Sequence, residues 1–182
     1  MPVACALIPR FRLIAAVSDR RVLSRAAALA PDPGAAQLIG EVTPAAEKSG
    51  LRAGMRMGEA LSRCPELVLI PPDPQRAESS WEHALRRLEG IGAEVESERA
   101  GEAFFEANGL TRLWGGIEGV LERTRTEIGK ARLGAGPARF CAYVAAASGA
   151  IVPDEAAREF LDPMPVSLLC GRLGEGEADD LP

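Results

Sequence analysis

Apolar residues alternate with charged and turn-forming residues in a way that predicts many short elements. Residues 3–8 form a continuous apolar run that ends at Pro9, which is typical of a buried strand. From residue 75 the apolar positions recur at spacings of three and four residues, which predicts an amphipathic helix to about residue 90. The residues that form this stripe are Ala77, Trp81, Ala84, Leu85, Leu88 and Ile91.

The chain beyond this helix predicts a hairpin followed by further helices and strands. A turn at residues 100–101 joins the two strands of the hairpin, and Pro137 stands where a helix start favours proline. The predicted elements are strands at 93–98, 102–107 and 131–135, and helices at 117–128, 137–147 and 154–161. Their order predicts an α+β fold in which two helices cover one face of a mainly antiparallel sheet, the ferredoxin-like arrangement.

A second group of short elements lies between the first strand and the long helix. Thr43 and Pro44 predict a helix start, with Thr as the cap and Pro at the first helical position, and Gly50 ends that helix. The other predicted elements are strands at 26–30, 37–42 and 67–70 and a helix at about 55–63. We therefore expect a small α/β lobe, residues 18–74, inserted after the first strand of a ferredoxin-like domain made of residues 1–17 and 75–160.

Composition is that of a globular protein with one ordinary domain or two small lobes. The chain has 182 residues, of which 47% are apolar, enough to fill a core. Its four cysteines are scattered without a CxxC or Cys/His pair, so we expect free and mostly buried thiols. The apolar run after Met1 is too short for a signal peptide or a membrane span. These features indicate a cytoplasmic protein without a membrane partner.

The charge balance limits what this chain binds by itself. The formal net charge is −5, with the surplus acid concentrated near the C-terminal end. Because phosphate neutralisation supplies most non-specific affinity for nucleic acid, a free-standing DNA-binding module is not expected. One basic group stands at helical spacing from two glutamates, which predicts ion pairs on a solvated face rather than a DNA contact. The group consists of Arg123, Arg125, Lys130 and Arg132, with Glu122 and Glu127 as the acids.

Four runs, in the right order, resemble motifs of the Y-family (UmuC/DinB-like) lesion-bypass DNA polymerases. Residues 40–55, GEVTPAAEKSGLRAGM, are similar to the fingers segment with its YEARxxG helix and following V/I-x-x-G-M. Residues 101–106, GEAFFE, resemble the palm hairpin SxDEAYLD, and residues 110–116, LTRLWGG, resemble the LFGG run of the ImuB-type subgroup. Residues 134–142, GAGPARFCA, are similar to the run GISxNKxLA. The resemblance covers the palm and fingers part of such a polymerase.

The resemblance implies a polymerase site whose residues have changed. Family members hold two Mg²⁺ ions with an Asp at the end of the first strand and an Asp-Glu pair at the hairpin, since hard Mg²⁺ binds carboxylate oxygens. The matching positions are Leu7, Gly101 and Glu102, and the first 17 residues contain no acid. The Tyr and Arg that hold the triphosphate match Pro44 and Glu47, which a helix start explains by itself. We therefore predict a vestigial site, with no catalytic, metal or cofactor-binding residue.

The resemblance further implies a non-catalytic, ImuB-type protein that supports DNA repair by translesion synthesis in the damage-induced (SOS) response. The implied partners are damaged DNA, bound weakly, and a replicative-type polymerase and sliding clamp. Two alternatives stay open: an active Y-family polymerase with a degenerate site, which would need Mg²⁺, and a protein-binding scaffold without a DNA role. We expect residues 161–182 to be the start of a truncated thumb and an acidic tail, because full-length family members continue into a thumb and a basic little finger.

Overall fold

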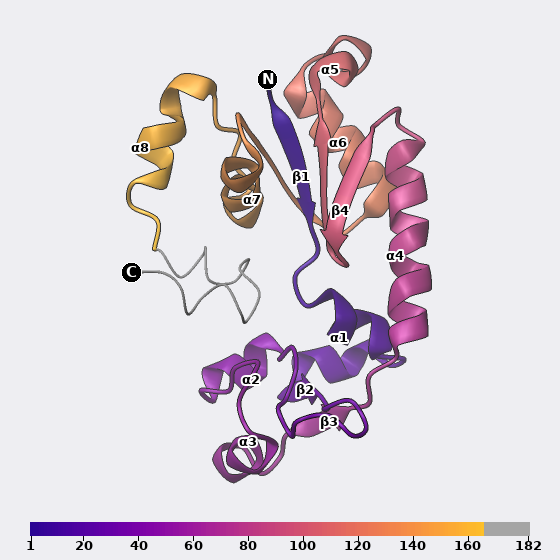
Figure 1. Cartoon of the computed structure of the whole chain (residues 1–182), viewed down its shortest axis with the longest axis vertical. Coiled ribbons are helices and arrows are strands. Elements are labelled where there is room, and N and C mark those ends of the chain that lie inside the picture. Colours follow the sequence, from indigo (N-terminus) through magenta and orange to yellow (C-terminus); the bar gives the residue numbers. More distant parts are fainter. Residues whose placement is uncertain (166–182) are drawn as a thin grey trace. The chain divides into compact units, whose positions relative to one another are not determined.

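The computed structural model describes residues 1–165, which form two compact units (Figure 1). One unit comprises Met1–Leu7, Ile91–Glu96 and residues 104–165. The other comprises Ile8–Gly90 and Ser97–Ala103. The predicted acidic tail, most of the predicted thumb segment and Cys170 lie outside the described residues.

A four-stranded sheet follows the predicted order of elements. Its strands are β1 (Val3–Leu7), β4 (Val95–Arg99), β5 (Glu102–Glu106) and β6 (Arg132–Gly136), in the order β4-β5-β1-β6. Along the chain α4 (Pro74–Glu89) follows β1 after the inserted segment, and α6 (Ile117–Ile128) connects β5 to β6. This is the βαββαβ order of the ferredoxin-like fold, with β1 and β5 in the middle of the sheet. The α+β prediction is confirmed.

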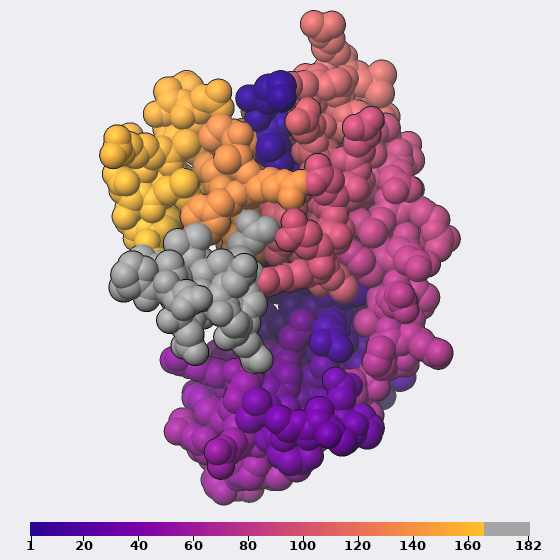
Figure 2. All heavy atoms as spheres, in the orientation of Figure 1, coloured from indigo at the N-terminus to yellow at the C-terminus, as the bar shows by residue number. Residues whose placement is uncertain are grey.

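The first unit packs α7 (Arg139–Ser148) closely against β1 and β6, which pair antiparallel. Gly134 on β6 makes this possible, because a Cβ at that position would lie 2.2 Å from the backbone nitrogen of Ala146. Cys5 and Phe104 fill the same core with small residues of α7. On its other side α7 contacts α8 (Ala157–Leu161), and Figure 2 shows the yellow atoms of α8 beside the orange segment.

The second unit is built on short elements around its own apolar core. Thr43 caps α2 as predicted, since its Oγ1 accepts a hydrogen bond from the backbone N–H of Ala46. Strand β2 pairs in parallel with β3. The elements are α1 (Phe11–Ala16), the 3-10 turn η1 (Arg20–Ser24), β2 (Ala27–Leu29), α2 (Pro44–Lys48), α3 (Met57–Arg63) and β3 (Val68–Ile70). The core residues are Ala28, Ile39, Val42, Ala46, Leu51, Ala60, Cys64 and Leu67.

Two local predictions differ from the structure. Residues 37–42 form no strand, because Leu38 bridges to Arg56 while Val42 bridges to Ala28, so the run is divided between two neighbours. The segment after the hairpin forms a helix that the sequence did not indicate, α5 (Asn108–Trp114), which begins without a side-chain cap. The two glycines that follow α5, Gly115 and Gly116, both have positive φ and form the turn between α5 and α6.

The thiols and the surface charges follow the sequence prediction. Cys5, Cys64 and Cys141 are buried thiols that take part in no disulfide among the described residues. On α6 Arg123 pairs with Glu127 and Arg125 pairs with Glu122, each at 2.6 Å, which confirms the predicted ion pairs. Among residues 1–165, no helix has both the length and the apolar character needed to cross a membrane.

Candidate functional site

The five motif positions lie on three short segments. Leu7 ends β1 and packs, half-buried, on the core cluster of the first unit. The other four belong to the second unit. Gly101 and Glu102 form the turn and the first residue of β5, whereas Pro44 and Glu47 are exposed on α2.

The turn at residues 8–11 connects the hairpin to the segment around α2. The backbone N–H of Ile8 donates to the carbonyl oxygen of Gly101 at 2.7 Å. Two residues later, the Nε of Arg10 donates to the carbonyl oxygen of Val42, also at 2.7 Å. The carbonyl groups of Gly101, in the hairpin, and of Val42, just before α2, are therefore both bonded to the same four-residue turn.

Arg10 has an unusual backbone and a specific partner. Among residues 1–165 it is the one non-glycine residue with a positive φ, 58°. Its Nη2 donates to the Oε2 of Glu47 at 2.7 Å, and the two side chains are 26% and 48% exposed. The sequence prediction treated Glu47 as a residue explained by the helix start alone. The structure adds an intramolecular ion pair, which that reasoning missed because the two residues are 37 positions apart.

Gly101 occupies a place that admits no side chain as the turn stands. Its φ is +92°, in the left-handed region that favours glycine. A Cβ there would lie 2.6 Å from the Cβ of Phe11 and 2.8 Å from the carbonyl oxygen of Ile8. The ring of Phe11 is itself held edge-on by Trp81, with centroids 5.1 Å apart. Trp81 is 7% exposed and donates from Nε1 to the Oγ of Ser97, so the wall around Gly101 is firmly packed.

Glu41 is a partly buried carboxylate beside the same turn that the motif comparison did not single out. Its Oε2 accepts from the backbone N–H of Leu13 at 2.7 Å. Burial raises the pKa of Glu41 above its ordinary value, although the Leu13 N–H and the charges of Arg12 and Arg10 act in the opposite direction. The one signal in the sequence is an acid inside an otherwise apolar run, residues 38–42.

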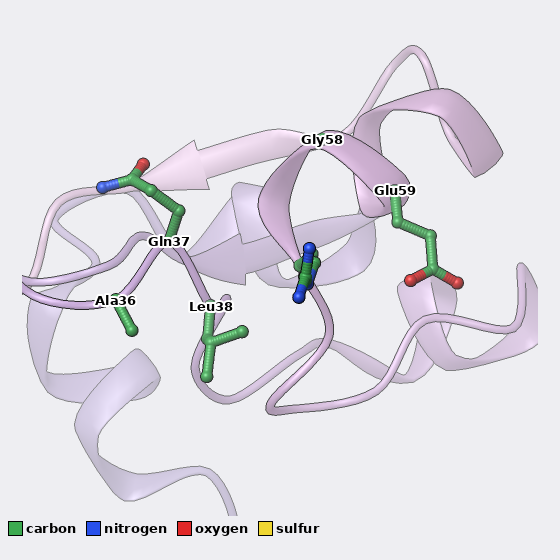
Figure 3. Close-up of a pocket in the computed structure, with 6 residues that line it drawn as sticks. Ala36, Gln37, Leu38, Gly58 and Glu59 are labelled. Carbon is green, nitrogen blue, oxygen red and sulfur yellow. The ribbon is translucent and has the colours of Figure 1, made fainter.

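No carboxylate cluster accompanies these residues. Across residues 1–165, no three His, Cys, Asp or Glu side chains come together in an arrangement that could hold a metal ion. A separate hollow of about 620 Å³ lies beside α3 (Figure 3), and none of the five motif positions lines it. Figure 3 shows Leu38 from the loop and Glu59 from α3 on its walls. Arg56 also lines it.

Comparison with known proteins identifies the family. The family described as impB/mucB/samB matches residues 13–147. The chain belongs to this family. The impB/mucB/samB match runs from α1 to the end of α7 and so includes parts of both units. The predicted resemblance to Y-family DNA polymerases is thereby confirmed.

Individual relatives of this impB/mucB/samB chain are longer than it. DNA polymerase IV of Ralstonia nicotianae is 26% identical over 163 residues, which are 84% of this chain and 46% of the relative. An insertion ternary complex of Dbh DNA polymerase has a TM-score of 0.78 at 17% identity, over 92% of this chain and 53% of that one. DinB from Sulfolobus solfataricus has a TM-score of 0.76 at 18% identity, over 98% of this chain and 56% of that one. The chain thus spans about half the length of these relatives.

Proposed function

We propose that this Y-family polymerase-like chain supports translesion DNA synthesis without catalysing nucleotide transfer, as an ImuB-type protein. The observation that carries the proposal is the packing at Gly101, the position matched to the first Asp of the family hairpin. With a φ of +92° and a Cβ position 2.6 Å from Phe11, an Asp fits there only if the turn moves. Because the surrounding backbone has adapted to glycine, the packing supports a position that no longer holds a metal ligand, rather than a recent replacement of Asp by Gly alone.

The donor set does not fit the metals of the family reaction. Two Mg²⁺ ions that bridge a primer hydroxyl and a triphosphate need several carboxylate oxygens. Glu102 supplies a carboxylate at the hairpin, but Leu7 ends β1 with an apolar side chain, and no acid stands in residues 1–17. We therefore assign no step of nucleotide transfer to these residues.

The nucleotide side of the site supports the same proposal. Pro44 and Glu47 stand where the family pattern has a Tyr and an Arg that hold the triphosphate. The carboxylate of Glu47 repels a phosphate, and it already engages Arg10 at 2.7 Å. The proposed vestigial site is thus closed by contacts within the chain.

The proposal includes a division of labour along the chain. Residues 1–17 and 75–160 would act as a palm and residues 18–74 as fingers, with the segment from 161 leading toward a thumb. The partners would be DNA in the cytoplasm, a replicative-type polymerase and a sliding clamp. One solved relative is described as an insertion ternary complex of a DNA polymerase, which supports a DNA-facing role for the shared fold.

Primer extension tests the proposal. With Mg²⁺ or Mn²⁺ and all four nucleotides, we expect no incorporation above buffer for the parent chain. The variant Gly101→Asp should also stay inactive, because the added side chain displaces the turn and Leu7 still lacks a carboxylate. Incorporation by the parent that disappears in Glu102→Ala would establish the active-polymerase alternative instead.

A scaffold without any DNA role is the second candidate, favoured by the net charge of −5. Crosslinking of the chain to a gapped primer-template, with and without a replicative polymerase and clamp, separates it from the accessory role. The accessory role requires crosslinks to DNA that increase when the partner proteins are present. A scaffold would give protein crosslinks alone.

A further inference from the structure

A cleft of about 240 Å³ lies between α1 and the first turns of α4, within the second unit. The apolar side chains of Phe11 and Ile14 line one part of it. Two arginines and two serines, Arg20, Arg76, Ser18 and Ser80, supply its polar part. The cleft therefore places two guanidinium groups and two hydroxyl groups around one small space.

The two arginines of this cleft are not neutralised by carboxylates. Arg76 donates from Nη1 to the Oγ of Ser18 at 3.3 Å, and neither Arg76 nor Arg20 forms an ion pair in the described part of the chain. The neighbouring acid, Asp19, forms an ion pair with Arg21 at 3.0 Å. Asp73 caps α4 by accepting from the backbone N–H of Arg76 rather than from its side chain.

The sequence around the cleft is locally basic in an acidic protein. Residues 1–26 contain five arginines and one acid, whereas the whole chain carries a net charge of −5. Elsewhere, helix arginines such as Arg63 and Arg86 pair with a glutamate four residues before them. The cleft arginines lack such a neighbour, so their charge is available to a ligand.

We propose that this cleft binds a phosphoryl group, either of a small phosphorylated molecule or of a nucleic-acid strand. Arginine presents planar N–H pairs that match phosphate oxygens, and serine hydroxyls add neutral donors. A bound phosphate would be held between Arg20 and Arg76, with Ser18 and Ser80 donating to the remaining oxygens. The apolar wall of Phe11 and Ile14 leaves room for a small organic part.

The site is distinct from the accessory role proposed above. None of the five motif positions lines the cleft. Phosphate binding and primer extension are separate measurements. Primer extension by the chain would contradict the accessory role but not the phosphate site. A failure to bind phosphate would contradict the phosphate site but not the accessory role.

Nuclear magnetic resonance of ¹⁵N-labelled protein, titrated with inorganic phosphate against chloride at matched ionic strength, provides the first arm. We expect saturable shifts at the amides of residues 18, 20, 76 and 80, and a loss of affinity of about tenfold in Arg20→Gln and in Arg76→Gln. The matched control is Arg21→Gln, one residue away but paired with Asp19, which should keep the parent affinity. All three side chains are exposed, so the fold should be retained.

A short oligothymidylate without a terminal phosphate provides the second arm. Loss of its binding in Arg20→Gln and Arg76→Gln, but not in Arg21→Gln, identifies a nucleic-acid strand as the source of the phosphate. Binding of inorganic phosphate alone identifies a small phosphorylated ligand. Shifts that do not saturate, shifts reproduced by chloride, or an equal loss in the control variant would overturn the proposal.

Discussion

Single residues determine how the turn at residues 8–11 is held. The carbonyl oxygen of Gly101 accepts a hydrogen bond from the N–H of Ile8, and the absence of a side chain on Gly101 leaves room for Phe11. Arg10 has a positive φ of 58°, and its side chain donates hydrogen bonds to the carbonyl oxygen of Val42 and to the carboxylate of Glu47. The turn is thus stabilised by contacts with the hairpin and with the segment around α2.

Replacement of Gly101 by alanine should destabilise the protein by about 2–6 kcal/mol, because a strained φ and an overpacked contact each cost about 1–3 kcal/mol. Urea denaturation followed by tryptophan fluorescence measures the change. Gly109→Ala is the matched control, since a Cβ at this helical position meets nothing within 4 Å. It should be neutral or stabilise by up to about 1 kcal/mol. Equal stability of both variants would contradict the packing argument.

Glu41 should make stability depend on pH. Its pKa is raised from an ordinary value of 4.5 by burial, so in the window above 4.5 the native state holds more protons than the unfolded chain. The contribution of this group to stability therefore falls as pH rises through that window. Glu41→Gln keeps an oxygen for the Leu13 N–H and removes the charge, so its stability relative to the parent should increase over the same window.

Denaturation of both proteins at a series of pH values measures this difference. Glu94→Gln, on an exposed residue, corrects for the loss of a carboxylate at the surface. A difference between Glu41→Gln and the parent that does not change with pH would show that Glu41 is hydrated in solution.

At the scale of elements, Thr43 joins β2 to α2. Its Oγ1 donates to the carbonyl oxygen of Arg25 at 2.7 Å and accepts from the N–H of Ala27 at 3.0 Å and of Ala46 at 3.3 Å. The side chain is 1% exposed, so no water replaces these bonds. One hydroxyl therefore satisfies backbone groups of a strand, a helix and the connection before the strand.

Thr43→Val should lower the free energy of unfolding by more than the loss of an ordinary helix cap does. The variant leaves buried backbone groups without hydrogen-bond partners, and each such group costs about 1–3 kcal/mol. Thr43→Ser keeps the hydroxyl and should lose much less. Chemical denaturation of the two variants gives the comparison directly. A valine variant as stable as the serine variant would mean that the three bonds contribute nothing to folding.

At the scale of the whole molecule, charge predicts weak binding to DNA. The chain carries a net charge of −5, and the arginines of α6 are paired with glutamates. We expect affinity for a primer-template no tighter than the non-specific range of about 10⁻⁴ to 10⁻⁶ M, with a shallow dependence on salt. Fluorescence anisotropy at several salt concentrations measures both. Nanomolar affinity at physiological salt would contradict the prediction and favour a dedicated DNA-binding surface.

Much of the fold was predictable because its elements have strong local signals. The helix at residues 117–128 matches α6, and the hairpin turn falls at the predicted residues. The long helix buries Ala77, Trp81 and Leu88 from the predicted stripe. Residues 37–42 were predicted wrongly as a strand because apolar alternation does not show that the two ends of the run have different partners. Helix α5 was missed because Asn108 and Gly109 at its start resemble a turn.

The sequence by itself determined most of the elements, the Thr43 cap and the positions of the family motifs, because helical and strand periodicity are local properties of the chain. Tertiary structure alone decided the hydrogen-bond partners and the surroundings of the motif residues and of their neighbours. Arg10 and Glu47 pair across 37 positions, and Glu41 meets Leu13 across 28. The space at Gly101 depends on where Phe11 and Trp81 lie. Contacts of this kind follow from the folded arrangement of distant segments, which no local pattern of residues encodes.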